Sequence, residues 1–320
     1  MSNKILLLCG DPNSINSEII YRSWNKLSSK LKKNIYLLGN FRLLSVQYKR
    51  LKIKNNLILV SNLKDKKNTR KLKVIDFPLK FNHPFKVNSK ESSKYIIKTL
   101  NYAHNLAITG EVKGLINCPI NKKLLNKTGI GVTEYLANKS RIVKNSEVMM
   151  IHNANLSVVP LTTHVKIKDV SKKINKKMII KKIQTLNKYY KKITKKTPKI
   201  AILGLNPHNA EFSKSSEEIT QILPAIRYLK KRGIKIYGPL SADTAFMSGR
   251  KNYNVIVGAY HDQVLAPFKS LYNFDAINLT LGLEYIRLSP DHGPALDLVG
   301  KNKANYLSLL KCIKFLDNQK

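Results

Sequence analysis

Short apolar runs rich in Ile, Leu and Val alternate along the chain with longer stretches of helical spacing. In the N-terminal part the apolar runs lie at residues 4–9, 34–39 and 57–60, and helix-like stretches lie at 17–31 and 92–108. Strands that are connected through helices tend to pair in parallel, and helices then cover both faces of the sheet. The alternation therefore predicts an α/β protein built on a largely parallel sheet.

Three further apolar runs are each followed within a few residues by a histidine. These are 156–161 with His164, 200–205 with His208, and 255–259 with His261. In open α/β sheets ligands bind outside the carboxyl ends of strands, so the three imidazoles could converge on one crevice. Three imidazoles with an open fourth position are typical of a catalytic metal site. Each histidine alone would be an ordinary loop residue, but their repeated placement favours a shared site.

The composition limits the class of protein. With 320 residues, 43% of them hydrophobic, the chain can bury the core of one large domain or two. It has no apolar run of about 18 residues, and its first apolar run is too short for a signal peptide. Cys9, Cys118 and Cys312 are too scattered for a disulfide framework or a Cys-x-x-Cys site. These features favour a cytoplasmic protein without a membrane partner.

The formal net charge of +39 comes mainly from lysine, because only nine of the 58 basic residues are Arg. Lysines spread through most helix-like segments, including one predicted helix at 169–192, and a charge run at 64–73 predicts a solvated surface loop. Arg-rich stretches with interleaved aromatics, which are typical of nucleic-acid binding, are missing. We therefore expect a solvated lysine surface and no specific nucleic-acid partner, although the charge should attract anionic substrates.

Several short motifs along the chain combine polar and conformationally special residues. In chain order, the motifs are Cys118-Pro119-Ile120-Asn121-Lys122, Thr133-Glu134-Tyr135-Leu136-Ala137, Leu161-Thr162-Thr163-His164, Gly204-Leu205-Asn206-Pro207-His208, Gly238-Pro239-Leu240-Ser241-Ala242-Asp243-Thr244, Tyr260-His261-Asp262-Gln263-Val264-Leu265-Ala266-Pro267-Phe268-Lys269, Asn278-Leu279-Thr280-Leu281-Gly282-Leu283, Ile286-Arg287 and Ser289-Pro290-Asp291-His292-Gly293. Together they resemble the motifs of the 4-hydroxythreonine-4-phosphate dehydrogenase family (PdxA) of pyridoxal phosphate synthesis. The resemblance spans almost the whole chain, and its most specific part is the ten-residue block at 260–269.

The resemblance implies a fold like that of isocitrate and isopropylmalate dehydrogenases, in which two α/β domains flank an active-site cleft. The first domain would be discontinuous, at 1–130 and 285–320. The second, at 131–284, would carry the metal ligands and the dimer interface. The family also implies a homodimer that completes each active site across its interface. The implied cofactors are NAD, with NADP as an alternative, and a divalent metal, namely zinc, magnesium or cobalt.

The resemblance also implies roles for individual residues. The implied metal ligands are His164, His208 and His261. The implied substrate-binding residues are Thr133, Lys269, Asn278 and Arg287. Asp291, His292 and Gly293 would lie near the nucleotide. Lys and Arg side chains suit a phosphate and a carboxylate, and an Asn amide adds directional hydrogen bonds. His292 as a fourth metal ligand is a less favoured alternative to a loop or nucleotide contact.

The implied reaction is oxidation of 4-phosphooxy-L-threonine at C3 by NAD. Its product, 2-amino-3-oxo-4-phosphooxybutanoate, is a β-keto acid that loses CO₂ to give 3-amino-2-oxopropyl phosphate, a step toward pyridoxine 5'-phosphate. A metal on the histidines would stabilise the developing alkoxide. A general base must take the hydroxyl proton, and the candidates are Asp243, in a polar loop, and Asp262, next to a metal ligand. Either could instead orient a histidine.

The chain departs from the family pattern mainly in its loops. Val132 stands where the family has a substrate-contacting histidine, although Thr133 is retained. In the first loop, Ser14, Asn16 and Ser17 replace two glycines and a proline of the family. In the loop after His208, Ala210, Ser213 and Ser216 replace glycines. In the loop after His292, Pro294 replaces a threonine. Because only glycine adopts positive φ without strain, these changes bear on substrate choice and cofactor affinity. The histidine triad is untouched.

Alternative functions remain open. A sister dehydrogenase acting on another phosphorylated hydroxy acid, such as D-threonate 4-phosphate, is compatible with Val132. A nonenzymatic basic binding protein is disfavoured by the intact ligand and phosphate-binding residues. Acyl transfer on acyl phosphates, whose enzymes share the fold, is disfavoured by the histidine triad. The usual Gly-x-Gly-x-x-Gly fingerprint is absent, so NAD follows from the resemblance alone.

Overall fold

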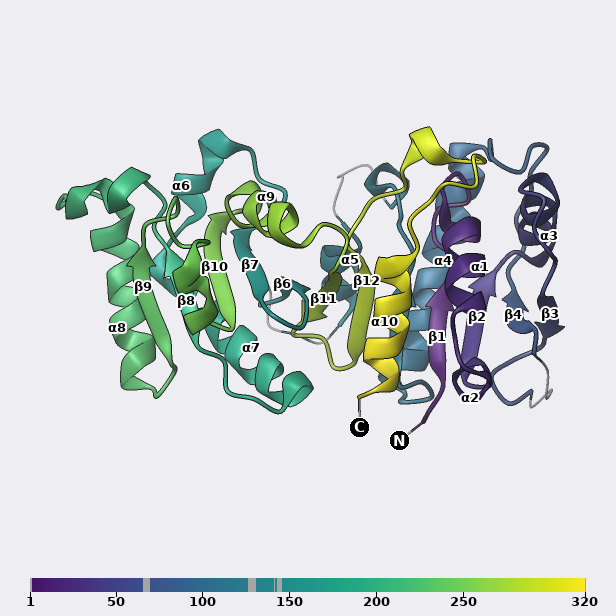
Figure 1. Ribbon diagram of the computed structural model, residues 1–320, viewed down its shortest axis with the longest axis horizontal. Coiled ribbons are helices and arrows are strands. Elements are labelled where there is room, and N and C mark those ends of the chain that lie inside the picture. The colour runs from purple at the N-terminus through teal and green to yellow at the C-terminus, as the bar shows by residue number, and fades with distance from the viewer. Residues whose placement is uncertain (1, 66–69, 126–130, 141, 143–145, 320) are drawn as a thin grey trace. The chain divides into compact units, whose positions relative to one another are not determined.

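The computed structural model describes the chain except residues 1, 66–69, 126–130, 141, 143–145 and 320 (Figure 1). Its residues form two compact units. The first comprises Met1–Ser140 and Glu284–Lys320, and the second comprises Arg141–Leu283. The second unit thus begins at residue 141, whereas the domain expected from the resemblance begins at residue 131.

The first unit contains a parallel sheet in the order β3-β4-β2-β1-β5-β12. The predicted parallel pairing is therefore confirmed in this unit. The C-terminal helix α10 packs beside α1 and β1, so both ends of the chain build this unit (Figure 1). Its elements are β1 (Ile5–Leu8), α1 (Asn16–Asn25), α2 (Ser29–Lys32), β2 (Ile35–Gly39), α3 (Phe41–Arg50), β3 (Leu57–Val60), β4 (Leu72–Asp76), α4 (Ser89–Ile108), β5 (Gly114–Asn117), α5 (Val132–Lys139), β12 (Ile286–Pro290) and α10 (Leu307–Asp317), with the short helices η1 (Lys122–Leu124) and η6 (Leu296–Leu298).

Two expectations for the first unit differ from the structure. The helix expected at 17–31 is interrupted, because Ser28 accepts a hydrogen bond from the Leu31 amide and starts α2 as a new helix. The lysine run at 64–73, expected as a solvated loop, includes residues 66–69, which lie outside the described residues; its last residue, Lys73, is buried inside β4. The Lys73 ammonium donates to the Lys33 carbonyl at 2.6 Å and lies 4.1 Å from the Tyr36 ring centroid, which compensates its burial.

The second unit contains a mixed sheet in the order β11-β6-β7-β10-β8-β9. Strands β7, β10, β8 and β9 pair in parallel, whereas β6 pairs antiparallel with both β7 and β11. The elements are β6 (Val148–His152), β7 (Ser157–Thr162), α6 (Val170–Lys173), α7 (Lys176–Thr194), β8 (Ile200–Leu203), α8 (Leu223–Lys231), β9 (Ile236–Leu240), β10 (Val255–Tyr260), α9 (His261–Tyr272) and β11 (Ile277–Leu281), with the short helices η2 (Ile167–Asp169), η3 (Pro207–Phe212), η4 (Glu218–Ile222) and η5 (Ser248–Asn252).

The single lysine-rich helix expected at 169–192 is divided into α6 and α7. Ile174 leaves the helical conformation at ψ 115°, and the Asn175 side chain accepts a hydrogen bond from the Met178 amide at 2.9 Å. An asparagine N-cap satisfies one of the amides that a new helix leaves without an intrahelical partner. The local capping residue therefore overrides the helical spacing that continues across it.

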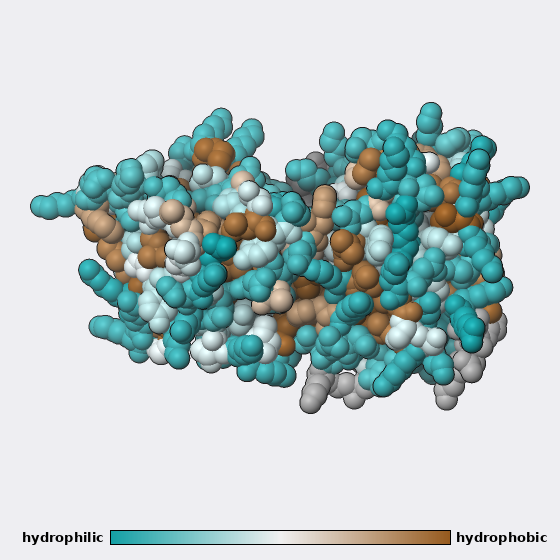
Figure 2. Space-filling model, viewed as in Figure 1, coloured by the Kyte–Doolittle hydropathy of each residue, from teal (hydrophilic) through white to brown (hydrophobic). Residues whose placement is uncertain are grey.

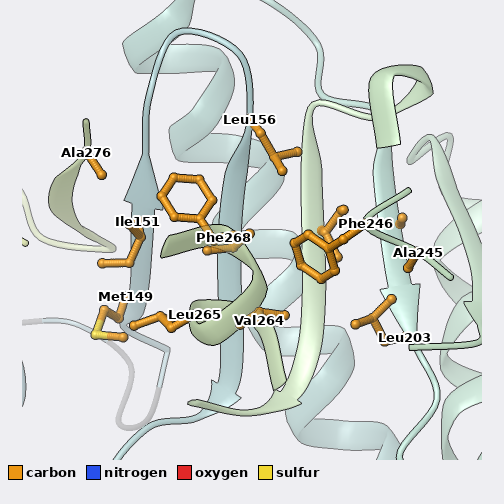
Figure 3. Packing of buried hydrophobic residues seen from close by; sticks show 13 residues of the cluster. Met149, Ile151, Leu156, Leu203, Ala245, Phe246, Val264, Leu265, Phe268 and Ala276 are labelled. Atoms are coloured by element: carbon orange, nitrogen blue, oxygen red, sulfur yellow. The ribbon is translucent and has the colours of Figure 1, made fainter. Parts of the chain in front are cut away.

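A buried cluster under α9 forms part of the core of the second unit (Figure 3). Val264, Leu265 and Phe268 of α9 pack against Ile151 and other side chains of the sheet below. Fully burying side chains of this size contributes about 1.5–3 kcal/mol each. Because α9 begins at His261, this packing also fixes the position of that histidine.

The surface agrees with the lysine-rich composition. Hydrophilic side chains cover most of the face seen in Figure 2. Within the described ranges, no helix is long and apolar enough to cross a membrane. The three cysteines are free thiols and are all buried.

Candidate active site

The three histidines predicted to bind the metal follow three neighbouring parallel strands of the second unit. Strand β10 lies between β7 and β8, and Tyr260 of β10 is opposite Thr162 of β7. The Thr162 hydroxyl donates to the Ala259 carbonyl at 2.7 Å, which ties these two strand ends together. His164 follows β7 by two residues, and His261 directly follows β10.

His164 and His261 lie close to each other as a result. Their ring centroids are 6.3 Å apart, with an angle of 31° between the ring planes. Zinc binds imidazole nitrogen at about 2.0–2.1 Å, so two rings at this separation could share one ion. The Nδ1 atom of His261 is hydrogen-bonded to the Asp262 carboxylate at 2.6 Å. A ring that donates from Nδ1 presents its lone pair on Nε2, as in carboxylate–histidine–metal arrangements.

His208 is placed differently from the other two histidines. It lies in η3, where residues 208 to 211 adopt left-handed backbone with φ between 48° and 59°. Across the described parts of the chain, no group of three His, Cys, Asp or Glu side chains is arranged to hold a metal ion. The structure therefore brings His164 and His261 together but does not add His208 to them.

The departure at Ala210 falls inside this left-handed segment, with φ 51°. An L-residue with a Cβ atom pays roughly 1–2 kcal/mol for this conformation, which glycine adopts freely. Ser213, by contrast, has φ −56°. The loss of a family glycine is thus costly at Ala210 and not at Ser213.

Glu218 and Gln263 hold the loops that carry the histidines. Glu218, which is 0% exposed, accepts hydrogen bonds from the Leu205 and Asn206 amides at 2.8 and 2.9 Å. Gln263 accepts from the Ala259 amide at 2.7 Å and donates to the Gly204 carbonyl at 2.8 Å. Gln263 thereby connects the start of α9 to the end of β8.

The Glu218 carboxylate stays ionised despite its burial. Burial raises the pKa of Glu218. Hydrogen bonds from Asn206 and Leu205 lower it by more than burial raises it, so the net shift of the pKa is downward. A sequence pattern could not have identified this contact, because Glu218 lies in a stretch of ordinary helical polarity 12 residues away from Asn206.

The other predicted residues of the second unit lie on neighbouring elements. Asp243 is exposed and its carboxylate accepts from the Thr244 amide at 3.0 Å. Lys269 lies in the last turn of α9. The Oδ1 atom of Asn278 in β11 is buried and, among the described residues, has no hydrogen-bond partner. A buried acceptor of this kind is costly unless a ligand satisfies it, which fits the predicted substrate contact.

The first unit holds a second group of predicted residues around Arg287. The Arg287 guanidinium is 3% exposed, and its Nη1 donates to the Thr133 hydroxyl at 3.1 Å. Its Nε donates to Asn117 Oδ1 at 2.7 Å. Burial lowers the pKa of Arg287 to about 10, while the nearby Tyr285 and Glu134 raise it. The guanidinium is therefore cationic at neutral pH.

The chain matches one protein family over most of its length. The family model described as "Pyridoxal phosphate biosynthetic protein PdxA" matches residues 30–316. The chain belongs to the PdxA family. A relative from Aquifex aeolicus named 4-hydroxythreonine-4-phosphate dehydrogenase is 37% identical, with 99% of this chain and 98% of the relative covered. A relative of the same name from Sulfurihydrogenibium is 36% identical, over 97% and 96% of the two chains.

Solved structures agree with this membership in the PdxA family. A 4-hydroxythreonine-4-phosphate dehydrogenase from Klebsiella pneumoniae matches with a TM-score of 0.84 and 27% identity, over 98% of both chains. An isocitrate dehydrogenase from Methylococcus capsulatus matches with a TM-score of 0.50 and 12% identity, over 98% of this chain and 84% of that one. The second match shows the fold alone. The predicted dehydrogenase-like α/β fold is therefore confirmed.

The first-loop departures from the PdxA pattern are compensated locally. Asn16 donates to the Pro119 carbonyl at 2.8 Å, and the Ser14 hydroxyl donates to the Asp11 carbonyl at 2.6 Å. Gly10, with φ 75°, remains where a Cβ atom would come within 2.7 Å of the Pro119 carbonyl oxygen. Side-chain hydrogen bonds thus hold this loop where the family uses glycine.

The predicted nucleotide-contacting residues follow β12 in the first unit. The Asp291 amide donates to the Ser308 hydroxyl at 2.9 Å, and Asp291 itself is buried. His292 Nδ1 contacts the Gly293 carbonyl at 3.0 Å. Pro294, the departure in this loop, accepts a hydrogen bond from the Ile15 amide at 3.3 Å. The loop is therefore anchored to α10 and to the first loop, and its nucleotide contacts stay a prediction.

Proposed function

We propose that this protein is an NAD-dependent dehydrogenase of pyridoxine 5'-phosphate synthesis. It oxidises 4-phosphooxy-L-threonine at C3 to 2-amino-3-oxo-4-phosphooxybutanoate, which loses CO₂ to give 3-amino-2-oxopropyl phosphate. The observation that carries the proposal is the near full-length match to relatives named 4-hydroxythreonine-4-phosphate dehydrogenase. The homodimer, its shared active site and the cytoplasmic location belong to this proposal as well.

The cationic and amide side chains account for binding of a phosphorylated amino acid. Arg287, with Thr133 beside it, supplies a buried positive charge for an acidic group of the substrate. A buried charge is little screened by salt, so it attracts an anion more strongly than a surface lysine does. Lys269 and Asn278 supply a second cation and an amide, and the buried Oδ1 of Asn278 accepts a substrate N–H or O–H.

His164, His208 and His261 would hold a divalent metal, zinc, magnesium or cobalt. The 6.3 Å separation of the His164 and His261 rings, and the carboxylate on His261 Nδ1, fit this assignment for two of the three ligands. When bound, the ion supplies Lewis-acid stabilisation of the oxygen charge that develops at C3. Asp262 then orients the His261 ring, and Gln263 and Glu218 hold the loops that carry the ligands.

Oxidation requires two transfers from the substrate. The C3 hydrogen leaves as hydride to C4 of the nicotinamide, while the hydroxyl proton goes to a base, and the C–O single bond becomes a carbonyl. Asp243 is the better candidate for the base, because Asp262 is already hydrogen-bonded to His261. Asp243 is exposed, and its carboxylate accepts a hydrogen bond from the Thr244 amide of its own loop.

The test is NADH formation by purified, metal-reconstituted protein, followed by absorbance. It compares 4-phosphooxy-L-threonine, D-threonate 4-phosphate and L-threonine. Turnover confined to the first substrate supports the proposal. Preference for D-threonate 4-phosphate would instead select the sister dehydrogenase, which Val132 at the start of α5 keeps open. A Val132→His variant is the matched control, since it restores the imidazole usual in the family and should shift preference toward the aminated substrate.

A further inference from the structure

Asn117 lies at the end of β5, beside the strand that carries Arg287. In the parallel register Arg287 is opposite Leu115, so Asn117 stands two residues nearer the carboxyl edge of the sheet. The Arg287 side chain extends toward that edge, and its Nε donates to Asn117 Oδ1 at 2.7 Å. Both residues are buried and belong to the first unit.

We propose that Asn117 is a positioning residue that holds the Arg287 guanidinium in its orientation toward Thr133 without neutralising its charge. Arg287 can then present a fixed cation to the acidic group of the substrate. The inference deepens the proposed function and rests on it for the identity of the ligand.

The choice of an amide at this position has an electrostatic consequence. A guanidinium has five N–H donors, and Asn117 and Thr133 each take one of them. Both of these acceptors are neutral, so neither forms an ion pair with the guanidinium; the nearby Glu134 carboxylate acts on the charge electrostatically and raises the pKa of Arg287. An aspartate at 117 would form an ion pair with Arg287 in a buried environment and weaken its attraction for an anion.

The orientation of the Asn117 amide is determined by its second contact. Its Nδ2 donates to the Cys118 carbonyl at 3.2 Å, while Oδ1 receives the Arg287 donor. The reversed amide would place an NH₂ group against the Arg287 Nε–H and a lone pair against a carbonyl oxygen, which are two repulsive contacts. Asn117→Asp therefore retains the acceptor for Arg287, whereas Asn117→Leu retains the size of the side chain and loses the acceptor.

The first measurement is the exchange rate of the Arg287 Nε–H proton, observed by NMR with ¹⁵N-labelled arginine. Arg287→Lys identifies the resonance among the nine arginines. We expect slow exchange in the wild type and in Asn117→Asp, and exchange at least about tenfold faster in Asn117→Leu. Unchanged exchange in Asn117→Leu overturns the positioning role. If that variant fails to fold, Asn117→Ser, whose hydroxyl is too short to reach Nε, replaces it.

The second measurement separates KM from kcat for 4-phosphooxy-L-threonine. We expect KM to rise about tenfold in both Asn117→Leu and Asn117→Asp, with a smaller change in kcat. Asn101→Leu is the matched control, because Asn101 lies on α4 and accepts a hydrogen bond from Tyr135 of α5 at 2.9 Å. Its KM should stay within about twofold of wild type. An unchanged KM in Asn117→Asp overturns the role of charge preservation.

The two measurements also separate failure of the inference from failure of the proposed function. If the wild type does not turn over 4-phosphooxy-L-threonine, the proposed function is wrong, but the exchange rates still decide whether Asn117 positions Arg287. In that case, titration of the Arg287 resonance with inorganic phosphate replaces KM. Equal phosphate affinity of wild type and Asn117→Asp then contradicts the charge argument.

Discussion

The Arg287 group of the first unit and the histidine group of the second unit differ in how completely the protein organises them. Arg287 is 3% exposed and is held by Asn117 and Thr133. His164 and His208 are exposed, and the carboxylate that contacts His261, that of Asp262, is itself 81% exposed. The cation is prearranged by the fold, whereas the imidazoles are arranged only in part.

The two groups obtain their geometry from different sources. A buried guanidinium must have its hydrogen bonds satisfied for the protein to fold, so folding and anion recognition depend on the same contacts. Exposed imidazoles are solvated without a ligand, so their final arrangement can be decided by a bound ion or by a second subunit. We therefore expect substitutions in the Arg287 group to affect both stability and activity, and substitutions of the histidines to affect activity alone.

The largest effect is expected for Arg287→Met. Loss of two hydrogen bonds and of the buried charge should lower kcat/KM about a thousandfold. It should also destabilise the protein by roughly 2 kcal/mol, because the Asn117 acceptor then lacks its donor. Steady-state kinetics and urea denaturation measure the two effects. Arg42→Met, at an exposed arginine of the same unit, is the control, and comparable losses there would contradict the prediction.

His152 tests whether the burial of a side chain, and not the unit in which it lies, decides how strongly its substitution changes the free energy of unfolding. It lies in the second unit but is largely buried, and its Nδ1 contacts the Ser157 hydroxyl at 2.8 Å. Burial lowers the pKa of His152 from 6.5 to about 4. The unfolded state therefore binds the proton more tightly, so the stability due to neutral His152 is complete above pH 6.5 and is lost as the pH falls toward 4.

Replacing His152 by Gln should remove this pH dependence. Between pH 7 and pH 4 the wild type should lose about 3 kcal/mol more than His152→Gln. Urea denaturation at several pH values gives the two slopes. His83→Gln, at an exposed histidine, should follow the wild-type slope. Parallel curves for wild type and His152→Gln would show that the imidazole is not kept neutral by burial.

His164→Ala should separate activity from stability. Removing one of two neighbouring imidazoles should lower metal affinity and turnover about a hundredfold. The melting temperature of the metal-free protein should stay unchanged, because the side chain is exposed. Equilibrium dialysis against zinc and thermal denaturation in a chelator measure the two quantities, with His83→Ala as the control. A large loss of metal-free stability would remove the distinction drawn between the two groups.

The smallest effect is expected for Asp262→Asn. Loss of a partner that orients a metal-binding histidine lowers metal affinity roughly 10- to 100-fold. The Asp262 carboxylate is mostly exposed, so we expect the lower value, about tenfold.

Asp243→Asn should instead lower kcat and remove the limb of the pH–rate profile that belongs to the base, without changing metal affinity. If the two variants exchange these results, the assignment of orienting residue and base must be exchanged as well.

Local patterns predicted much of the architecture. The apolar runs at 57–60, 156–161 and 255–259 match β3, β7 and β10 to within one residue at each end. The parallel pairing of the first unit follows from the alternation of such runs with helices. The same patterns placed His164 and His261 beyond adjacent strand ends, where their rings are 6.3 Å apart. Two local predictions were wrong. The lysine-rich helix is divided because Asn175 caps the start of α7, and Lys73 is buried in a strand where a solvated loop was expected.

Periodicity and turn residues act over a few positions, so the amino-acid pattern alone predicts which segments become strands and which residues stand at strand ends. Two contacts appear only in the folded chain: Asn117 receives the donor of Arg287, 170 positions away, and Glu218 holds the loop before His208. Such pairings depend on strand order and register, which no local pattern encodes. Burial then makes each pairing obligatory, since an unsatisfied polar group away from water is too costly to keep.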